Sequence, residues 1–307
     1  MNLEDFLSVA KKDYNSIFGK VEHSNSINGV NVDLRFKFIQ FDPNGDPKIN
    51  LLIKKLLSYF THYCFSAQKR RINELPTEQE RNEMYREAQK LFRKWKQEEI
   101  TDKNKPASGE MGEMILWFLM EAVLESPQMV AKMDLKTNRQ MESFGSDGIH
   151  MKIIDDILNI FFGEAKLYKD VGEAIDSIFE SIEKFHKDKM WEHEYNMVTT
   201  HFKYLKEGEK QKVFDFISGK IQSQDIKINH ACLVGYDWSE YKKLDDQTRR
   251  QEFIDTFKTK YQEDTIRLAR LIQSRFDKFS KKQFHFEVFF LPVKSVQELR
   301  DKFNEEL

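Results

Sequence analysis

Apolar residues follow two different periods along the chain, and the change of period predicts a mixed α/β fold. Runs rich in β-branched and aromatic residues predict strands at 29–41, 148–154, 158–168, 226–238 and 284–293. Apolar residues at helical spacing predict helices at about 48–71, 77–98, 108–125, 171–187, 240–279 and 295–307. Residues 128–136 are a further candidate strand. The short "DD" between 148–154 and 158–168 predicts an antiparallel hairpin.

The segment "TDKNKPAS", residues 101–108, is the clearest linker in the sequence. It suggests an N-terminal α/β region at 1–105, a core at 106–238, and a C-terminal helical extension with a final strand and helix at 239–307. From 108 to 238 the predicted order is helix–strand–strand–strand–helix–strand. The core is therefore expected to be α/β.

Composition narrows the class of protein. Hydrophobic residues make up 40% of the 307-residue chain and charged residues 33%, with 49 Lys and Arg against 51 Asp and Glu. This balance indicates a globular protein without a global attraction to nucleic acid or anionic lipid. The longest apolar run, 114–120, is too short to span a bilayer, and the N-terminus does not resemble a secretory signal. With only two cysteines, we expect a reduced, cytoplasmic protein that does not contact membranes.

Two opposite charges lie in the most apolar predicted strand. In "NIFFGEAKLY" the alternation of a strand places Glu164 and Lys166 on the same face. One interpretation is a solvated salt bridge at a strand edge. The other is a functional pair, for which Asp134-x-Lys136 is the one competing motif in a possible strand.

Other acids could join this pair. Asp147, between Ser146 and Gly148, fits a turn aspartate, yet the hairpin could bring its carboxylate beside Glu164. Glu113 precedes "MILWFLM" in a helix that is apolar nearly all round, and a buried carboxylate is costly unless it is paired or binds a metal. Glu110, one turn earlier, could serve instead or simply favour the helix N-terminus.

Three carboxylates and a lysine at one sheet edge suit phosphoryl chemistry. Carboxylate oxygens are preferred ligands of Mg²⁺, with Mn²⁺ as a substitute. A bound metal would polarise a phosphoryl group and generate hydroxide from water. Lys166 could orient that water or neutralise charge developing on the phosphate.

Glu113 on a helix, then Asp147, then Glu164-Ala165-Lys166 resembles the pattern of the PD-(D/E)XK, or restriction-endonuclease-like, superfamily. More narrowly, "LKTNRQMESFGSDGIHMK" followed by "FFGEAKLY" resembles the nuclease-effector family of the Hachiman anti-phage defence system, over about 108–170. Ser146 replaces the usual Pro before the Asp, and residues 171–187 lack the Gln often found after the Glu-x-Lys strand.

The resemblance implies a Mg²⁺-dependent DNA nuclease in a complex with a superfamily 2 helicase, released when infection disturbs that complex. It implies that Asp147, Glu164 and the backbone carbonyl of Ala165 bind metal, that Lys166 assists catalysis, and that Glu113 or Glu110 contributes from the helix. The alternative is a catalytically inactive nuclease-like module that serves as a binding subunit of such a complex.

Contacts to DNA could come from two basic segments. Residues 69–96 and 239–282 each carry an excess of four positive charges, which could follow phosphates along a backbone. Solvated helix faces are the alternative explanation, and a partner helicase could supply most of the DNA binding.

Overall fold

The computed structural model of the protein describes residues 3–66, 69–70, 77–100, 109–131, 133, 146–155, 157–190, 226–241 and 250–307. The chain divides into two compact units, each assembled from three segments. The first unit comprises Met1–Ala10, Leu56–Gly163 and Phe185–Ile228, and the second comprises Lys11–Lys55, Glu164–Lys184 and Asn229–Leu307. The predicted division into 1–105, 106–238 and 239–307 follows chain order and stays a prediction.

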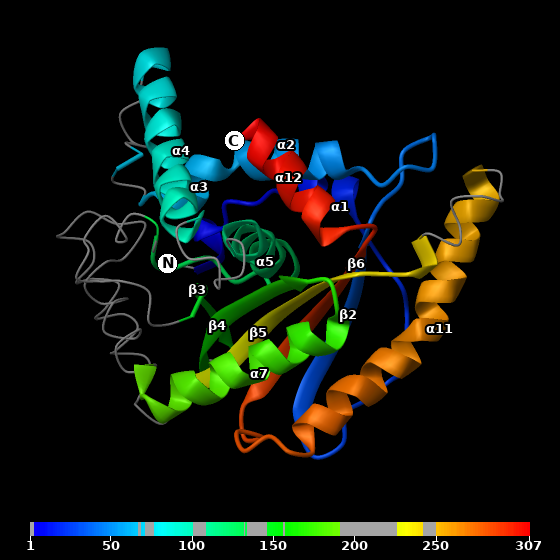
Figure 1. Cartoon of the computed structure of the whole chain (residues 1–307). Coiled ribbons are helices and arrows are strands. Elements are labelled where there is room, and N and C mark those ends of the chain that lie inside the picture. The colour runs from blue at the N-terminus through cyan, green and yellow to red at the C-terminus, as the bar shows by residue number, and fades with distance from the viewer. Residues whose placement is uncertain are drawn as a thin grey trace. The chain divides into compact units, whose positions relative to one another are not determined.

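The mixed α/β class is confirmed (Figure 1). Six strands form a sheet in the order β1-β2-β6-β5-β4-β3. Their bounds are β1 Phe18–Lys20, β2 Asn31–Ile39, β3 Gly148–Ile154, β4 Ile157–Tyr168, β5 Ile226–Asp237 and β6 His285–Val293. The helices are a 3₁₀ turn Leu3–Phe6, α1 Lys11–Ile17, α2 Ile49–Ser58, α3 Phe60–Cys64, α4 Glu78–Ile100, α5 Glu110–Val123, α7 Val171–Lys187, α11 Arg250–Phe276 and α12 Val296–Glu306.

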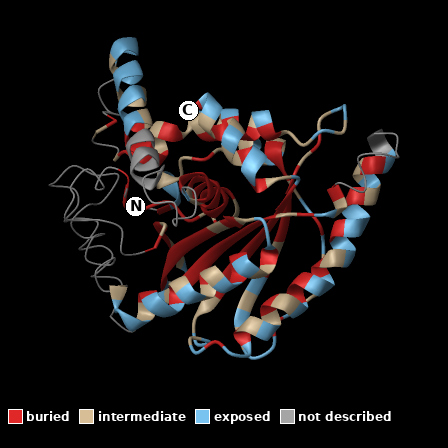
Figure 2. Ribbon diagram, in the orientation of Figure 1, coloured by how far each residue is buried: buried red, intermediate tan, exposed pale blue. Residues whose placement is uncertain are grey.

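The second unit is built on parallel strands. Strand β6 pairs in parallel with both β2 and β5, while the short β1 pairs antiparallel with β2. Helices α7 and α11 cover one face of these strands, and their inward sides are buried while their outward sides are exposed (Figures 1 and 2). Alternate strand residues pack against these helices in an aromatic-rich core that includes Phe36, Phe286, Phe290, Phe257 and Phe276. Apolar side chains spaced by two along the strands thus pack against apolar side chains spaced by three or four along the helices in one core.

The first unit contains helices α3, α4 and α5 and the β3–β4 hairpin. Helix α5 is buried on nearly every side, as its uniformly apolar sequence predicts. The hairpin pairs antiparallel from Gly148↔Gly163 to Ile154↔Ile157, which confirms the predicted hairpin. The face of the hairpin that carries Met151, Ile160 and Phe162 joins a separate apolar cluster.

Several predicted elements differ from the structure. The single helix expected over 48–71 is divided at Tyr59, whose N–H bonds three residues back to Leu56 and closes a tighter turn. The short α1 and β1 were not predicted, because seven and three residues are too few to show a period.

Within its described residues, the candidate strand 128–136 forms only isolated bridges, at Gln128 and Val130, and Gln128 bridges antiparallel to His150. Hydrogen bonds from Met129 N to Ile149 O and from Met151 N to Pro127 O hold this segment beside β3. The positive φ of Glu125 and the proline at 127 restrict the backbone that leads into it. Residues 132 and 134–136 lie outside the described residues.

Candidate active site

Strand β4 carries an ion pair in a buried setting in the second unit. Lys166 Nζ lies 2.7 Å from Glu164 Oε1, and the two side chains are 23% and 11% exposed. The short distance confirms that both side chains lie on one face of the strand, as alternation predicts. Among the described residues, Glu164 Oε2 makes no hydrogen bond or ion pair.

The residues after Glu164 are held by contacts on both faces of the strand. Ala165 and Leu167 are buried, and the carbonyl of Leu167 accepts a hydrogen bond from Arg300 of α12. Leu167 occupies the space that a Cβ at Gly235 would need, so β5 requires glycine there. Tyr168 bonds to Ser177 of α7 at 3.2 Å. The backbone that presents Glu164 and Lys166 is therefore fixed by packing, which is what a positioned functional pair requires.

Asp147 lies at the open end of the hairpin in the first unit. Its N–H donates to the carbonyl of Gly163 at 2.8 Å, and the Ser146 hydroxyl donates to the carbonyl of Gly148 at 3.0 Å. The last hairpin pair is Gly148↔Gly163. Asp147 and Glu164 are the next residues along the two strands, and the meeting of their carboxylates stays a prediction.

Helix α5 brings its two acids to the same region of the first unit as Asp147. Tyr63 of α3 donates to Glu113 at 3.3 Å. Burial raises the pKa of the Tyr63 hydroxyl well above its usual range, and the negative charges of Glu113, Asp147 and Glu110 add to that rise. Three of the candidate acids, Glu113, Asp147 and Glu110, thus act on one buried phenol, and Glu164 is not among them. Glu110 is buried and Glu113 is partly buried, and both lie in the first turn of α5.

Gly163 allows the hairpin to approach α5 closely in the first unit. A Cβ on Gly163 would lie 3.2 Å from Leu116 of α5 and 3.4 Å from the backbone of Gly148. A side chain here would push the hairpin away from the helix. The glycine before Glu164 thus helps to keep the acids of α5 and the turn that carries Asp147 together.

One residue of this arrangement was missed by the sequence argument. Tyr63 belongs to a helix whose apolar pattern does not distinguish a buried tyrosine from an ordinary core aromatic. Only the three-dimensional position of its hydroxyl beside Glu113 marks it. The competing Asp134-x-Lys136 motif lies outside the described residues.

Comparison with known families identifies the group to which this sequence belongs. The family model HamA matches residues 12–307, nearly the whole chain. The chain belongs to the HamA family. HamA is a protein of the Hachiman system, so this chain is a component of a multi-protein anti-phage defence system. The predicted resemblance to the Hachiman family is thereby confirmed. No curated protein matches the sequence significantly.

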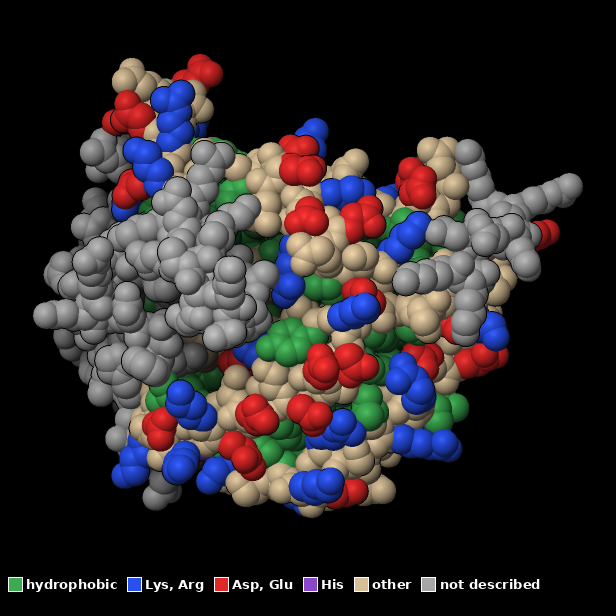
Figure 3. Space-filling model, in the orientation of Figure 1, with side chains coloured by type: hydrophobic (Ala, Val, Ile, Leu, Met, Phe, Trp, Pro, Cys, Tyr) green, Lys and Arg blue, Asp and Glu red, His purple; other side chains and the backbone are tan. Residues whose placement is uncertain are grey.

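Two further findings on this HamA-family chain concern the length of its apolar helices and the distribution of its charged side chains. No helix in the described part of the chain is long and apolar enough to cross a membrane. On the face shown in Figure 3, positive and negative side chains are interspersed. On α11, Arg267 pairs with Asp264, and Arg275 pairs with Asp176 of α7. Asp176 lies outside 239–282, so its pair with Arg275 offsets part of the positive excess predicted over that segment, whereas Asp264 is already counted in the excess.

Proposed function

We propose that this HamA-family protein is the nuclease effector of its Hachiman system and hydrolyses phosphodiester bonds of DNA with a divalent metal ion. The observation that carries the proposal is the buried Glu164–Lys166 pair. Glu164 directly follows Gly163, whose carbonyl accepts a hydrogen bond from the N–H of Asp147. A restriction-endonuclease-like core of the PD-(D/E)XK type is part of the proposal. The described order α5, β3, β4, α7, β5 agrees with the predicted order except at its first strand, 128–136, where the described residues form only isolated bridges.

The proposed metal ligands are all oxygens. They are the carboxylates of Asp147 and Glu164 and the backbone carbonyl of Ala165, with Glu113 or Glu110 contributing from α5. Such a set fits Mg²⁺, with Mn²⁺ as a substitute. The absence of a partner for Glu164 Oε2 among the described residues supports this fit, because a ligand oxygen must have a lone pair directed at the ion. Bound Mg²⁺ would polarise the phosphoryl group and lower the pKa of a water molecule.

The proposed role of Lys166 is electrostatic. Its stem is largely buried and its ammonium is held within 2.7 Å of Glu164. A fixed ammonium beside the metal ligands would orient the attacking water or neutralise charge that develops on the phosphate in the transition state. The contact with Glu164 keeps the ammonium in place before substrate arrives, so little reorganisation is needed during the reaction.

We further propose that a superfamily 2 helicase of the same system restrains the nuclease and that disturbance of the complex by infection releases it. Membership of a multi-protein defence system supports a partner. An unrestrained nuclease would cut the DNA of its own cell, so restraint is a functional necessity. The balanced charge of the chain suggests that the partner supplies much of the DNA binding.

The same ion pair favours a second candidate function. Glu164 is already paired with Lys166, and a satisfied pair can persist without metal. In that case the chain would be a catalytically inactive, nuclease-like binding subunit of the complex. The two functions predict different results in one experiment. The nuclease cleaves DNA only when a divalent ion is present, whereas the binding subunit does not cleave DNA with any ion.

The test is plasmid degradation by the purified chain, alone and with the co-expressed helicase. With Mg²⁺ we expect the chain alone to cleave the plasmid, and we expect EDTA to abolish that cleavage. In the complex with the helicase, we expect little cleavage until the complex is disturbed. Co-elution of the two proteins at micromolar concentration is expected. Separate elution would contradict the proposed partner, whereas EDTA-insensitive cleavage, or none in any state of the complex, would favour the binding subunit.

A further inference from the structure

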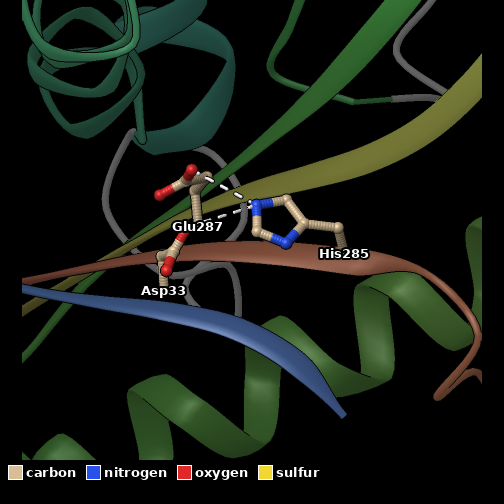
Figure 4. A group of neighbouring side chains, drawn as sticks. All are labelled: Asp33, His285 and Glu287. Atoms are coloured by element: carbon tan, nitrogen blue, oxygen red, sulfur yellow. Dashed lines mark hydrogen bonds and ion pairs between the residues drawn. The ribbon is translucent and has the colours of Figure 1, made fainter. Parts of the chain in front are cut away.

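A second group of potential metal ligands lies on neighbouring strands of the second unit. Strands β2 and β6 pair in parallel with Asp33 opposite Glu287 and Asn31 opposite His285. Alternation places Asp33, His285 and Glu287 on one face of the sheet, and Figure 4 shows the three side chains turned toward one another. Two acids directly opposite on adjacent strands repel each other, so this arrangement requires positive charge nearby.

The distances suit one shared cation. His285 Nε2 lies 3.2 Å from Glu287 Oε1 and 3.7 Å from Asp33 Oδ2, and the three ligand atoms all lie within 4.8 Å of one another. When metal–ligand bonds are about 2.0–2.2 Å long, ligand atoms are separated by about 3–3.5 Å. The two measured distances are therefore close to those around a bound ion. The remaining adjustment falls on Asp33, whose side chain is 60% exposed and free to move.

A second layer of contacts holds Glu287. Arg35 donates to Glu287 through Nε to Oε2 at 2.5 Å and through Nη2 to Oε1 at 3.1 Å. Such outer contacts orient the carboxylates of metal sites. Two carboxylates lie here with one guanidinium, so the group has more acidic than basic side chains, which favours a cation.

We propose that Asp33, His285 and Glu287 bind one divalent transition-metal ion of the zinc class. An imidazole nitrogen with two carboxylates is a ligand set of zinc sites that retain water in the remaining position, and it is poorly suited to Mg²⁺. The ion would lie between His285 Nε2 and Glu287 Oε1, with the neutral imidazole carrying its proton on Nδ1. It joins β2 to β6, and its binding therefore stabilises the second unit. The site is independent of the proposed nuclease function.

The binding test uses the full-length chain stripped of metal and titrated with Zn²⁺ by calorimetry, in parallel with thermal melts. Wild-type protein is expected to bind Zn²⁺ saturably and to melt at a higher temperature with Zn²⁺ than without. Asp33→Asn and His285→Gln are each expected to weaken Zn²⁺ binding by at least about tenfold and to remove the shift in Tm. Excess Mg²⁺ should not displace the ion.

His23→Gln is the matched control. The His23 ring bonds only to backbone groups, through Leu34 O and Asn25 N, so its loss should not change Zn²⁺ binding. Asp33→Asn keeps the proposal testable even if His285→Gln fails to fold, because Asp33 is exposed. The proposal is overturned if wild-type protein binds no Zn²⁺ saturably, or if Asp33→Asn binds it as tightly as wild type.

Discussion

The two carboxylate groups of the second unit, one on β4 and one on β2 and β6, are paired in different ways. Glu164 meets a lysine two residues along its own strand and retains an oxygen without a partner among the described residues. Glu287 meets an arginine from the neighbouring strand that engages both of its oxygens, and it shares one of them with His285. A buried ion pair therefore does not by itself reveal the role of a carboxylate. Such a pair can engage one oxygen, as at Glu164, or both oxygens, as at Glu287.

Ligand chemistry extends this contrast. The proposed set around Glu164 contains only oxygens and suits Mg²⁺, whereas the set around Glu287 includes an imidazole and suits a softer ion. Experiments that separate the two metals therefore test both assignments together.

The largest expected effect is loss of cleavage in Asp147→Asn and Glu164→Gln. Each change removes a formal charge with almost no change of shape, so loss of packing cannot explain a defect. We expect Mg²⁺-dependent plasmid degradation to be abolished, with melting curves like those of wild type. The control is Asp155→Asn in the turn of the same hairpin, at φ 50°, which asparagine adopts readily. Unfolding of the two site variants would instead indicate structural acids.

Lys166→Met separates the proposed role of Lys166, which acts on the substrate, from that of Glu164, which binds the metal. The change keeps most of the aliphatic stem and removes the ammonium, so cleavage should fall by roughly two to three orders of magnitude. Lys152→Met is a matched control, because Lys152 is 21% exposed, against 23% for Lys166, and also pairs with a carboxylate, that of Glu125. It should be nearly neutral, as should Lys136→Met at the competing motif. Cleavage retained in Lys166→Met and lost in Lys136→Met would place the active site elsewhere.

Glu164→Gln also tests whether the two metal sites are separate. This variant should lose Mg²⁺-dependent cleavage but keep the upward Zn²⁺ shift of Tm, because Glu164 is not among the zinc ligands. Thermal melts with each metal measure this directly. A Zn²⁺ shift that vanishes in Glu164→Gln would mean that the two groups act as one site.

A smaller effect is expected at Lys37, a lysine without a carboxylate partner among the described residues. Burial lowers the pKa of Lys37 to about 8, and the charges of Arg35 and Lys20 add to this. Because the pKa is lower in the folded than in the unfolded state, the charged form opposes folding. This penalty is complete below pH 8 and disappears as pH rises toward the unfolded value of 10.5.

Lys37→Met should therefore stabilise the fold at pH 7, by about 1–3 kcal/mol from the size of the pKa shift. The gain should shrink as pH approaches the unfolded pKa of lysine, and denaturant unfolding at several pH values measures it. Lys258→Met is the control, since Lys258 is exposed on α11 and should have little effect. A gain of equal size at every pH would contradict the charge explanation.

The sequence predicted most of the fold because its strongest patterns are local. The hairpin, α5, α7, β5 and β6 follow from periodicity alone. The predicted last helix is also present, and Ser295 caps it by accepting from Glu298 N. The break at Tyr59 and the short strand β1 could not be predicted, because they depend on contacts from distant segments.

The candidate site was only partly accessible from sequence. Glu164 and Lys166 stand out because charge interrupts an apolar strand. The phenol of Tyr63 among three carboxylates, and the triad of Asp33, His285 and Glu287, form only when separate segments fold together. Residues 33 and 285 are brought side by side by parallel pairing, and no local pattern encodes that register.

The most direct test of the nuclease assignment is a calorimetric titration of Mg²⁺ into wild-type protein, Glu164→Gln and Lys166→Met. If Glu164 is a metal ligand and Lys166 acts on the substrate, Glu164→Gln should bind Mg²⁺ at least about tenfold more weakly. Lys166→Met should bind it at least as tightly as wild type, because a nearby positive charge has been removed. Mg²⁺ binding that is unchanged in Glu164→Gln, or a Lys166→Met protein that unfolds, would show that the pair is structural and contradict the assignment.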